Sequence, residues 1–316
     1  MSQKHTTKGK RKTETKQHKM NVKLLPLALG ILLMVAGAIG IIYSSGDDEQ
    51  WSVSDEGILS YPEITDVDYS SNDISGANDT DTIREVSFES RGSEIAGLIR
   101  IPESATNIPG VVVLPGAGVS KEQQTAVPQL LSSLGYASIT LDQRNLGGID
   151  MQSDLALYMN GTEPVEYMMV YDALAAANVL AEQSEIDDDN IAMLGLSNGG
   201  RFAIIATAIK PEIKGVIGIS TSGYDTGSIV VDETVDMDAY LFYRSIDPDN
   251  YLGMISPRRF VMLHSINDSI VPYELALRTY DKAEEPKALY QINASTHGYS
   301  PLMAEDIENE LAIMFQ

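Results

Sequence analysis

Short apolar runs alternate with longer amphipathic stretches over most of the chain. The short runs predict buried strands, and apolar residues at intervals of three and four predict helices. The expected strands are residues 83–90, 94–101, 110–114, 137–141, 191–196, 216–219, 260–264 and 288–292. The expected helices are residues 121–134, 166–180, 200–209, 273–283 and 301–315. Strands that alternate with helices predict an α/β fold with a doubly wound, mostly parallel sheet.

Three segments depart from this alternation. Residues 83–90 and 94–101 alternate apolar and polar side chains on either side of a short turn, which predicts an antiparallel hairpin at the start of the sheet. A loop is expected over 142–164, and an acidic, tyrosine-rich insert over 220–257. Because long loops in compact domains are often functional, the insert is expected to be either a lid or a packed segment.

The first 81 residues lack this pattern and divide into three parts. Residues 1–23 are polar and basic, which predicts a disordered cytoplasmic tail. Residues 24–43 are 20 uncharged, mostly apolar residues, long enough as a helix to span the roughly 30 Å hydrocarbon core of a membrane. Residues 44–81 are acidic and polar and are expected to be a linker, so the folded domain is expected over 82–316.

The charges around the apolar run predict an orientation. Lysines precede it and acids follow it, which by the positive-inside rule places the N-terminus in the cytoplasm and the folded domain outside the cell membrane. A cleaved signal peptide is the alternative, because Ala36-Gly37-Ala38 has the small-x-small form of a cleavage site. The apolar run continues beyond this triplet, which favours an uncleaved, single-pass anchor.

Charge and cysteine content exclude several classes of function. Residues 1–23 hold eight of the 22 Lys and Arg residues and one of the 45 acids, so the rest of the chain carries 44 acids against 14 bases. Such a negative surface repels phosphate, so nucleic acid is not an expected partner. The chain has no cysteine, which excludes disulfides, a thiol nucleophile and cysteine-ligated metals.

The stretch Gly195-Leu-Ser-Asn-Gly199 joins an expected strand to an expected helix. A G-x-S-x-G pattern in this setting is typical of a nucleophile elbow, where the serine points out of the sheet and the helix N-terminus favours negative charge. A simple structural turn is the alternative, because glycine and serine are common. The remainder of the chain favours Ser197 as a nucleophile.

A nucleophilic serine needs an imidazole base and a carboxylate that orients it. Beyond the apolar run the chain has two histidines. His264 ends a strand and is expected to be structural, whereas His297 lies in a loop that can reach over the elbow. Asp268 follows the strand that His264 ends. The candidate triad is therefore Ser197, Asp268 and His297, with a helix cap as the alternative role of Asp268.

The oxygen that becomes negative during acyl transfer needs two backbone N–H donors. The N–H of Asn198, directly after the nucleophile, is the first candidate. The second is the N–H of Ala117, with Gly118 as an alternative, because a glycine-rich turn at 115–118 follows a strand and lets the backbone approach a substrate. Arg144 is expected to form a structural ion pair.

From about residue 83 the chain resembles the α/β-hydrolase superfamily, most of all its dienelactone hydrolase-like and acyl-peptide-hydrolase-like branches. The resemblance rests on PGAG at 115–118, D-x-R at 142–144, GLSNGG at 195–200, NDSIVP at 267–272 and THG at 296–298. Two positions depart from it. Pro115 stands where a histidine is familiar in the oxyanion loop, and Asn145 stands where D-x-R is commonly followed by glycine.

The resemblance implies a serine hydrolase that cleaves an ester, thioester or amide through an acyl-enzyme and needs neither metal nor organic cofactor. A small-molecule carboxylic ester is the favoured substrate, and a peptidase or amidase of the same fold is the alternative. A different class also remains open, namely a non-catalytic α/β-hydrolase scaffold that binds at the cell surface.

Overall fold

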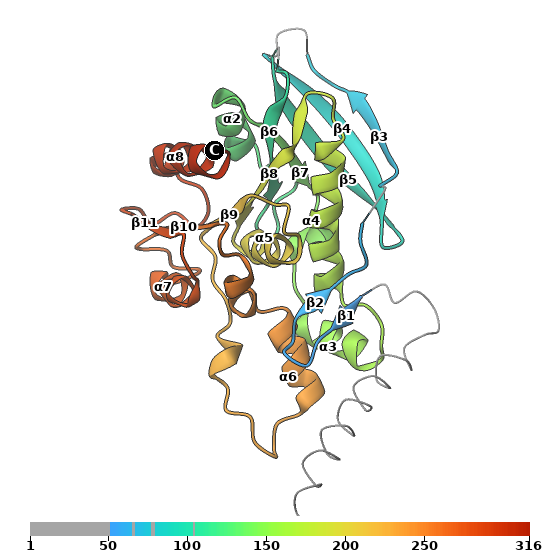
Figure 1. Cartoon of the computed structure of the whole chain (residues 1–316), viewed down its shortest axis with the longest axis vertical. Helices are drawn as coiled ribbons and strands as arrows, with labels where there is room; N and C mark the ends of the chain where they lie inside the picture. The colour runs from blue at the N-terminus through green and yellow to red at the C-terminus, as the bar shows by residue number, and fades with distance from the viewer. Residues whose placement is uncertain (1–50, 65–66, 77–79, 104) are drawn as a thin grey trace, which may run out of the picture. The chain divides into compact units, whose positions relative to one another are not determined.

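The computed structural model describes residues 51–64, 67–76, 80–103 and 105–316. A nine-stranded sheet with helices on both faces dominates this part of the chain (Figure 1). The strands are β3 (Tyr69–Asp73), β4 (Asp81–Ser90), β5 (Ser93–Pro102), β6 (Ile108–Leu114), β7 (Ala137–Leu141), β8 (Ile186–Leu196), β9 (Gly215–Ile219), β10 (Arg259–Ser265) and β11 (Lys287–Ile292). A separate ribbon pairs β1 (Ser52–Val53) with β2 (Leu59–Ser60).

Seven α-helices and several short 3₁₀ turns connect these strands within the described ranges. The helices are α2 (Ala126–Ser133), α3 (Met151–Met159), α4 (Val165–Ala181), α5 (Asn198–Ile209), α6 (Met237–Ser245), α7 (Tyr273–Lys282) and α8 (Ala304–Met314). The 3₁₀ turns are η1 (Arg144–Gly147), η2 (Thr226–Ser228), η3 (Pro248–Asn250), η4 (Leu252–Met254) and η5 (Pro301–Met303). The elements alternate along the chain, as the sequence predicts.

The strand order across the sheet is β11-β10-β9-β8-β6-β7-β5-β4-β3. The six strands from β11 to β7 run parallel, and β5, β4 and β3 extend the sheet as antiparallel strands at one edge. This is the doubly wound, mostly parallel sheet with an antiparallel hairpin that the sequence predicts. Because parallel strands all point the same way, their carboxyl ends share one edge, where ligands of such sheets bind.

Alternation along the strands divides the core between the two faces of the sheet. Val111 and Val113 of β6 pack with residues of α2 and α8, whereas Val112 and Leu114 pack with residues of α4 and α5. Successive side chains of a strand point to opposite faces, so a strand buried on both faces is apolar at every position. Figure 1 shows α2 and α8 on one side of the sheet and α4 and α5 on the other.

Part of the expected linker 44–81 is folded, which corrects the predicted start of the domain at residue 82. Strand β3 pairs with β4 over five residues. The ring of Trp51 lies 5.3 Å from that of Tyr167, and Leu59 is buried. The apolar side chains in this segment therefore pack against the domain. The polar strand β3 forms backbone hydrogen bonds with the otherwise unpaired edge of β4.

The two expected irregular stretches also contain helices. Within 142–164, helix α3 begins after Asp150, whose carboxylate accepts a hydrogen bond of 3.1 Å from the N–H of Ser153. Within 220–257, helix α6 begins after Asp236, which caps it in the same way. Both insertions are thus organised by aspartate N-caps, which satisfy backbone donors at a helix start. Helix α2 is shorter than expected, because Ser120 and Gln123 form a turn before it.

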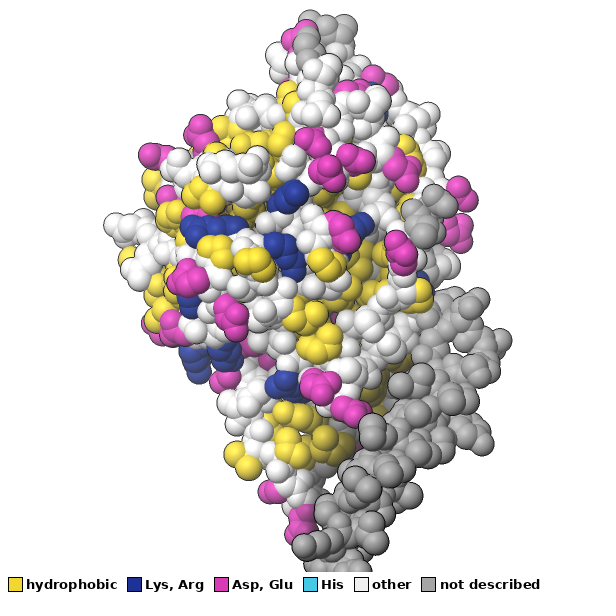
Figure 2. Space-filling view, viewed as in Figure 1, with side chains coloured by type: hydrophobic (Ala, Val, Ile, Leu, Met, Phe, Trp, Pro, Cys, Tyr) yellow, Lys and Arg dark blue, Asp and Glu magenta, His cyan; other side chains and the backbone are white. Residues whose placement is uncertain are grey.

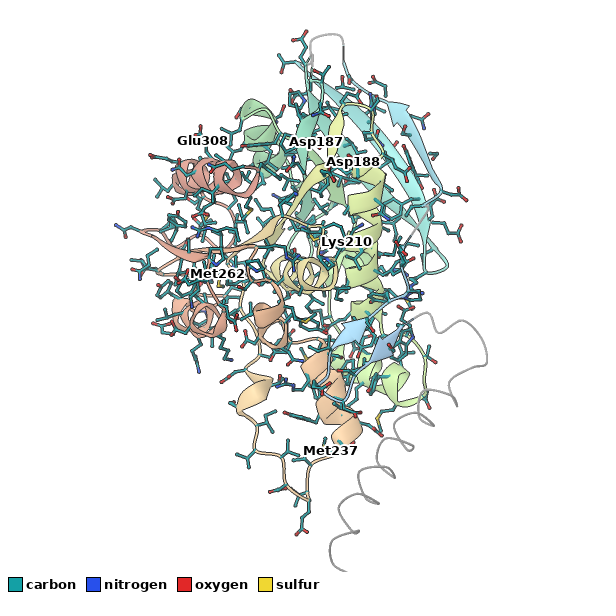
Figure 3. All side chains as sticks on the ribbon, in the orientation of Figure 1. Asp187, Asp188, Lys210, Met237, Met262 and Glu308 are labelled. Atoms are coloured by element: carbon teal, nitrogen blue, oxygen red, sulfur yellow. The ribbon has the colours of Figure 1, made fainter. Side chains whose placement is uncertain are left out.

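The insert 220–257 is held to its surroundings at several points. Lys282 of α7 contacts Asp225 and Asp249, each at 2.5 Å. The hydroxyl of Tyr251 accepts a hydrogen bond of 2.9 Å from the N–H of Leu59. In Figure 3, Met237 of α6 lies at the far end of this insert from the sheet. The insert is therefore a packed segment over much of its length.

The described part of the chain contains no helix that is both long and apolar enough to cross a membrane. The expected anchor at 24–43 and the basic tail at 1–23 lie outside the described residues.

Charged side chains of both signs are mixed on the face that Figure 2 shows. Lys and Arg side chains lie between Asp and Glu side chains on this face, so its acids do not form one continuous patch there.

Candidate active site

Ser197 stands at the sharp turn between β8 and α5. Its backbone has φ 52° and ψ −119°, a conformation that L-residues rarely adopt. The neighbouring glycines permit this turn. A Cβ at Gly199 would lie 2.3 Å from the carbonyl oxygen of Leu114, and one at Gly195 would lie 2.3 Å from that of Gly199. Any side chain at either position would push the helix away from the strands, so the G-x-S-x-G pattern has a direct steric cause.

His297 meets this serine from the loop after β11. Its Nε2 lies 2.9 Å from Ser197 Oγ, and its Nδ1 lies 2.9 Å from Asp268 Oδ2. A carboxylate can only accept, so Nδ1 carries the proton and Nε2 is the free acceptor that faces the serine hydroxyl. The structure thus brings the three predicted residues together from the ends of β8, β10 and β11.

The carboxyl group of Asp268 is fully buried, and both of its oxygens accept hydrogen bonds. Besides His297, it accepts hydrogen bonds from the N–H groups of Ile270 at 2.8 Å and Val271 at 3.1 Å. Burial alone would raise the pKa of Asp268, but the hydrogen bonds from His297, Ile270 and Val271 outweigh it and hold the pKa below its ordinary value. The group is therefore an ionised acceptor at neutral pH.

His264 lies behind this group and is also buried. Its Nε2 donates to the carbonyl oxygen of Val271 at 2.8 Å and lies 3.6 Å from Asp268 Oδ2. Burial lowers the pKa of His264, which favours the neutral ring. The ring also contacts that of Tyr273, with a centroid distance of 6.1 Å, and it is His297 rather than His264 that meets Ser197. This position fits the structural role expected for it.

The loop 115–118 lies beside Ser197. A Cβ at Gly116 would stand 3.4 Å from Ser197 Cβ. The N–H of Gly118 donates to the carbonyl oxygen of Leu146 at 2.7 Å, so it is occupied. The N–H groups of Ala117 and Asn198 donate to no other group in the described residues. Ala117 is consequently the better of the two candidates in this loop.

Asp142 and Arg144 stabilise the loops around the site and do not contact the triad. Arg144 makes a two-pronged ion pair with Asp172 of α4, at 2.7 Å and 3.0 Å, and also donates to the carbonyl oxygen of Ser90. Asp142 accepts from the backbone N–H and the ammonium group of Lys121. Such paired guanidinium–carboxylate contacts fix geometry well, and Arg144 forms the structural ion pair that the sequence predicts.

Ser220 was not among the candidates from the sequence. It is buried at the end of β9, and its hydroxyl accepts a hydrogen bond of 2.9 Å from the N–H of Gly298, next to His297. A lone serine after a strand has no sequence signal for this role. Only the neighbouring position of β9 and the His297 loop reveals it.

One group of acids in the described residues is close enough to share a metal ion. Asp187, Asp188 and Asp189 lie near the start of β8, at the opposite end of that strand from Ser197, and two of the three are exposed. Figure 3 labels Asp187 and Asp188 in the upper part of the view, at the start of β8. Exposed acids of this kind are common without a metal, and this group has no contact with the candidate triad.

Comparison with solved structures identifies the same fold in several esterases. An acetyl xylan esterase from Paenibacillus sp. R4 superposes with a TM-score of 0.65 at 17% identity, covering 79% of this chain and 89% of that one. A glucuronoyl esterase from Solibacter usitatus superposes with a TM-score of 0.60 at 12% identity, covering 84% and 89%. At such low identity the likeness concerns the fold, which is that of α/β-hydrolases.

Two curated relatives match part of the sequence. The putative hydrolase YtaP of Bacillus subtilis is 26% identical over 152 residues, which is 46% of this chain and 50% of that protein. The uncharacterized protein YfhR of Escherichia coli O157:H7 is 26% identical over 136 residues, which is 42% of this chain and 47% of that protein. The chain thus spans about half the length of the curated relatives that it matches.

A family match covers more of the chain than these relatives do. Residues 63–240 match the acetyl xylan esterase (AXE1) family, a stretch that includes the hairpin, the loop 115–118, the turn at Ser197 and the first part of the insert. The superfamily expected from the sequence motifs is thereby confirmed. With its α/β-hydrolase sheet and a family match over more than half of its length, the chain belongs to the acetyl xylan esterase (AXE1) family.

Proposed function

We propose that the protein is a serine carboxylesterase with Ser197 as nucleophile, His297 as general base and Asp268 as the group that orients the base. The observation that carries this proposal is the unbroken line from Ser197 Oγ through the His297 ring to Asp268 Oδ2, with both hydrogen bonds at 2.9 Å. Membership of an esterase family favours an ester over an amide as the bond that is cleaved.

In the proposed reaction, Ser197 Oγ attacks the acyl carbonyl carbon and gives its proton to His297 Nε2. The carbonyl oxygen becomes negative and accepts hydrogen bonds from the N–H groups of Ala117 and Asn198. When the tetrahedral intermediate collapses, the leaving alcohol takes the proton from His297. Water then gives a proton to His297 and attacks the acyl-enzyme, and a second collapse releases the acid and restores Ser197.

Asp268 acts throughout as an ionised acceptor. Its carboxylate holds the Nδ1–H of His297, which keeps Nε2 free to accept the serine proton and stabilises the positive ring that forms. The burial of Asp268 and its two backbone donors fix its position, so the imidazole is oriented before a substrate arrives.

The first substrate class to examine is short-chain acyl esters, in particular acetyl groups on carbohydrates. The solved relatives include acetyl xylan esterases, which supports this choice. A net negative charge of −23 disfavours strongly anionic substrates at a distance, so uncharged acetylated sugars fit better than acidic ones.

The direct test uses p-nitrophenyl acetate and a fluorophosphonate probe that labels activated serines. Wild-type protein is expected to hydrolyse the ester and to take up the label, and Ser197→Ala is expected to do neither. Ser184→Ala, which removes an exposed hydroxyl bonded to Glu185, is the matched control and should behave as wild type.

Each other outcome would change either the assigned nucleophile or the proposed function. Labelling that survives in Ser197→Ala would show that the nucleophile is another residue. Faster turnover of p-nitroanilides than of esters would favour the peptidase or amidase alternative. A wild-type protein that is folded but neither labels nor turns over any acyl substrate would favour a binding scaffold.

We also propose that residues 24–43 hold this domain at the outer face of the cell membrane. The length and charge flanks of the apolar run support this. Protease added to intact cells should then digest the domain, and the domain should sediment with membranes. Release of the domain into the medium would favour a cleaved signal peptide, and protection from external protease would contradict the orientation.

A further inference from the structure

The side chain of Asn198 bridges two segments that are far apart in the sequence. Its Nδ2 donates a hydrogen bond of 3.0 Å to the carbonyl oxygen of Gly147 in the turn η1. Asn198 is also the first residue of α5, directly after Ser197. One residue therefore holds a candidate oxyanion N–H in its backbone and a link to a distant turn in its side chain.

The turn η1 also holds the loop 115–118, which carries the second candidate donor, the N–H of Ala117. The N–H of Gly118 donates to the carbonyl oxygen of Leu146 at 2.7 Å. A Cβ at Gly147 would stand 3.4 Å from the Cα of Ala117, so the two backbones are nearly in contact. Any displacement of η1 would thus move Ala117 as well.

A second contact fixes the orientation of the Asn198 side-chain amide. Its Oδ1 accepts a hydrogen bond from the guanidinium group of Arg201, one turn further along α5. An amide can donate only through its nitrogen, so the Arg201 contact directs Nδ2 towards the carbonyl of Gly147. A carboxylate at this position would place a negative oxygen against that carbonyl.

Arg201 is itself held in place. Its guanidinium group lies over the ring of Tyr224, 4.6 Å from the centroid, and Asp247 supplies negative charge nearby. The backbone N–H of Tyr224 is bound by Asp247 at 2.9 Å. The contacts therefore run from the insert through Arg201 and Asn198 to the turn that supports Ala117.

We propose that the side chain of Asn198 is a positioning residue for the oxyanion hole. Held by Arg201, it sets the separation between the N–H groups of Asn198 and Ala117 through the carbonyl of Gly147. This inference rests on the proposed esterase function. It assigns to the side chain a role distinct from that of the backbone N–H, which every residue except proline provides at this position.

The test compares Asn198→Ala and Asn198→Asp with wild type on p-nitrophenyl acetate, with active sites counted by fluorophosphonate titration. Both variants keep the backbone N–H and lose the side-chain amide that bonds Gly147, so any effect comes from the side chain. We expect kcat per titrated site to fall roughly ten- to a hundredfold while KM changes less than about twofold. Phenylboronic acid forms a tetrahedral adduct with a serine, so its inhibition constant should rise by a similar factor. Melting temperature should change little.

Two further variants make the result decisive. Arg201→Met removes the side chain that holds the Asn198 amide. It should also lower kcat, by a smaller factor than the Asn198 variants do. This variant also decides the matter if the Asn198 variants do not fold. Asn190→Ala is the matched control, because Asn190 makes a similar side-chain bond of 2.9 Å to Asp187 on β8, far from the serine.

Three results would overturn the inference. They are a kcat within twofold of wild type in Asn198→Ala, a loss of stability without a loss of kcat, and a boronate affinity that does not follow kcat. A wild-type protein without any ester turnover would contradict the proposed function itself, and the role of Asn198 would fall with it. Ester turnover that Asn198→Ala leaves intact would overturn this inference alone.

Discussion

The hydroxyl of Ser220 accepts a hydrogen bond of 2.9 Å from the N–H of Gly298, and this contact ties the end of β9 to the loop that carries His297. The N–H of Ser220 is itself bound to the carbonyl oxygen of Leu263 on β10. The proposed base is therefore positioned from two sides, by Asp268 through its ring and by Ser220 through the backbone of the neighbouring Gly298.

Ser220→Ala should consequently lower activity more than stability. Loss of one buried hydrogen bond is expected to cost about 1 kcal/mol of unfolding free energy. The freed His297 loop should lower kcat about tenfold, because the base spends less time within reach of Ser197. Ester kinetics and thermal melting check this. Ser133→Ala is the control, since its exposed hydroxyl donates a bond of 2.7 Å to the carbonyl oxygen of Leu130 on α2. An equal loss of kcat in both variants would contradict the prediction.

The strained backbone of Ser197 predicts that glycine stabilises this position. At φ 52° and ψ −119° a Cβ carries a steric cost that glycine lacks. Ser197→Gly should exceed Ser197→Ala in unfolding free energy by about 1–2 kcal/mol, and both should be inactive. Denaturant unfolding measures the difference.

An internal reference separates strain from general glycine effects. At the exposed Gln129 in the middle of helix α2 the order should reverse, with glycine about 1 kcal/mol less stable than alanine. If alanine is the more stable residue at position 197 as well, the serine turn stores no strain that glycine can relieve.

The two histidines should separate cleanly by kinetics. His297→Gln removes the proposed base and should lower kcat roughly a thousandfold or more with little change in melting temperature. His264→Gln keeps a donor for the carbonyl of Val271 but alters a buried ring, so it should lower the melting temperature and leave kcat per titrated site within about fivefold. Equal catalytic losses would mean that the base assignment is wrong.

Glu166 predicts a pH dependence of stability. Burial raises the pKa of Glu166 to about 8, although Arg201 opposes this, and one of its carboxyl oxygens lacks a partner in the described residues. The folded state thus binds the proton more tightly than the unfolded state. The resulting stability is complete below the ordinary pKa of about 4.5 and is lost as pH rises towards 8.

Glu166→Gln cannot ionise and should not lose stability in this way. Between pH 5 and 8, its unfolding free energy relative to wild type should rise by up to roughly 1.4 kcal/mol per pH unit. Urea unfolding at several pH values measures this. Glu182→Gln, at an exposed glutamate after the end of the same helix, should track wild type. A constant difference between Glu166→Gln and wild type would show that Glu166 is charged throughout.

The sequence predicts the parallel part of the fold because buried strands have a strong signal. Each parallel strand is covered on both faces, so strands such as β6 and β9 are continuous apolar runs bounded by turns. The relative positions of Ser197, Asp268 and His297 follow from the same regularity. Each comes after a different parallel strand, and the carboxyl ends of β8, β10 and β11 share one edge of the sheet.

Other features have no comparable signal in the sequence. Strand β3 is polar, and it forms because β4 offers an unpaired edge rather than because it buries side chains. Helix α3 is weakly amphipathic and depends on its Asp150 cap. Ser220 and the Asn198 side chain matter through partners that are 78 and 51 residues away. Such contacts exist only once the sheet order is known.

The folded segment 51–73 determines where an independently folding domain must begin. A chain that starts at residue 82 would lack β3 and expose the edge of β4. It would also uncover Tyr167, against which Trp51 packs, and leave the hydroxyl of Tyr251 without the N–H of Leu59. A shortened chain that starts at or just before Trp51 keeps these contacts and omits the apolar run 24–43. Soluble expression, crystallisation and the kinetic comparisons above should therefore use that boundary, although the motifs alone would suggest residue 82.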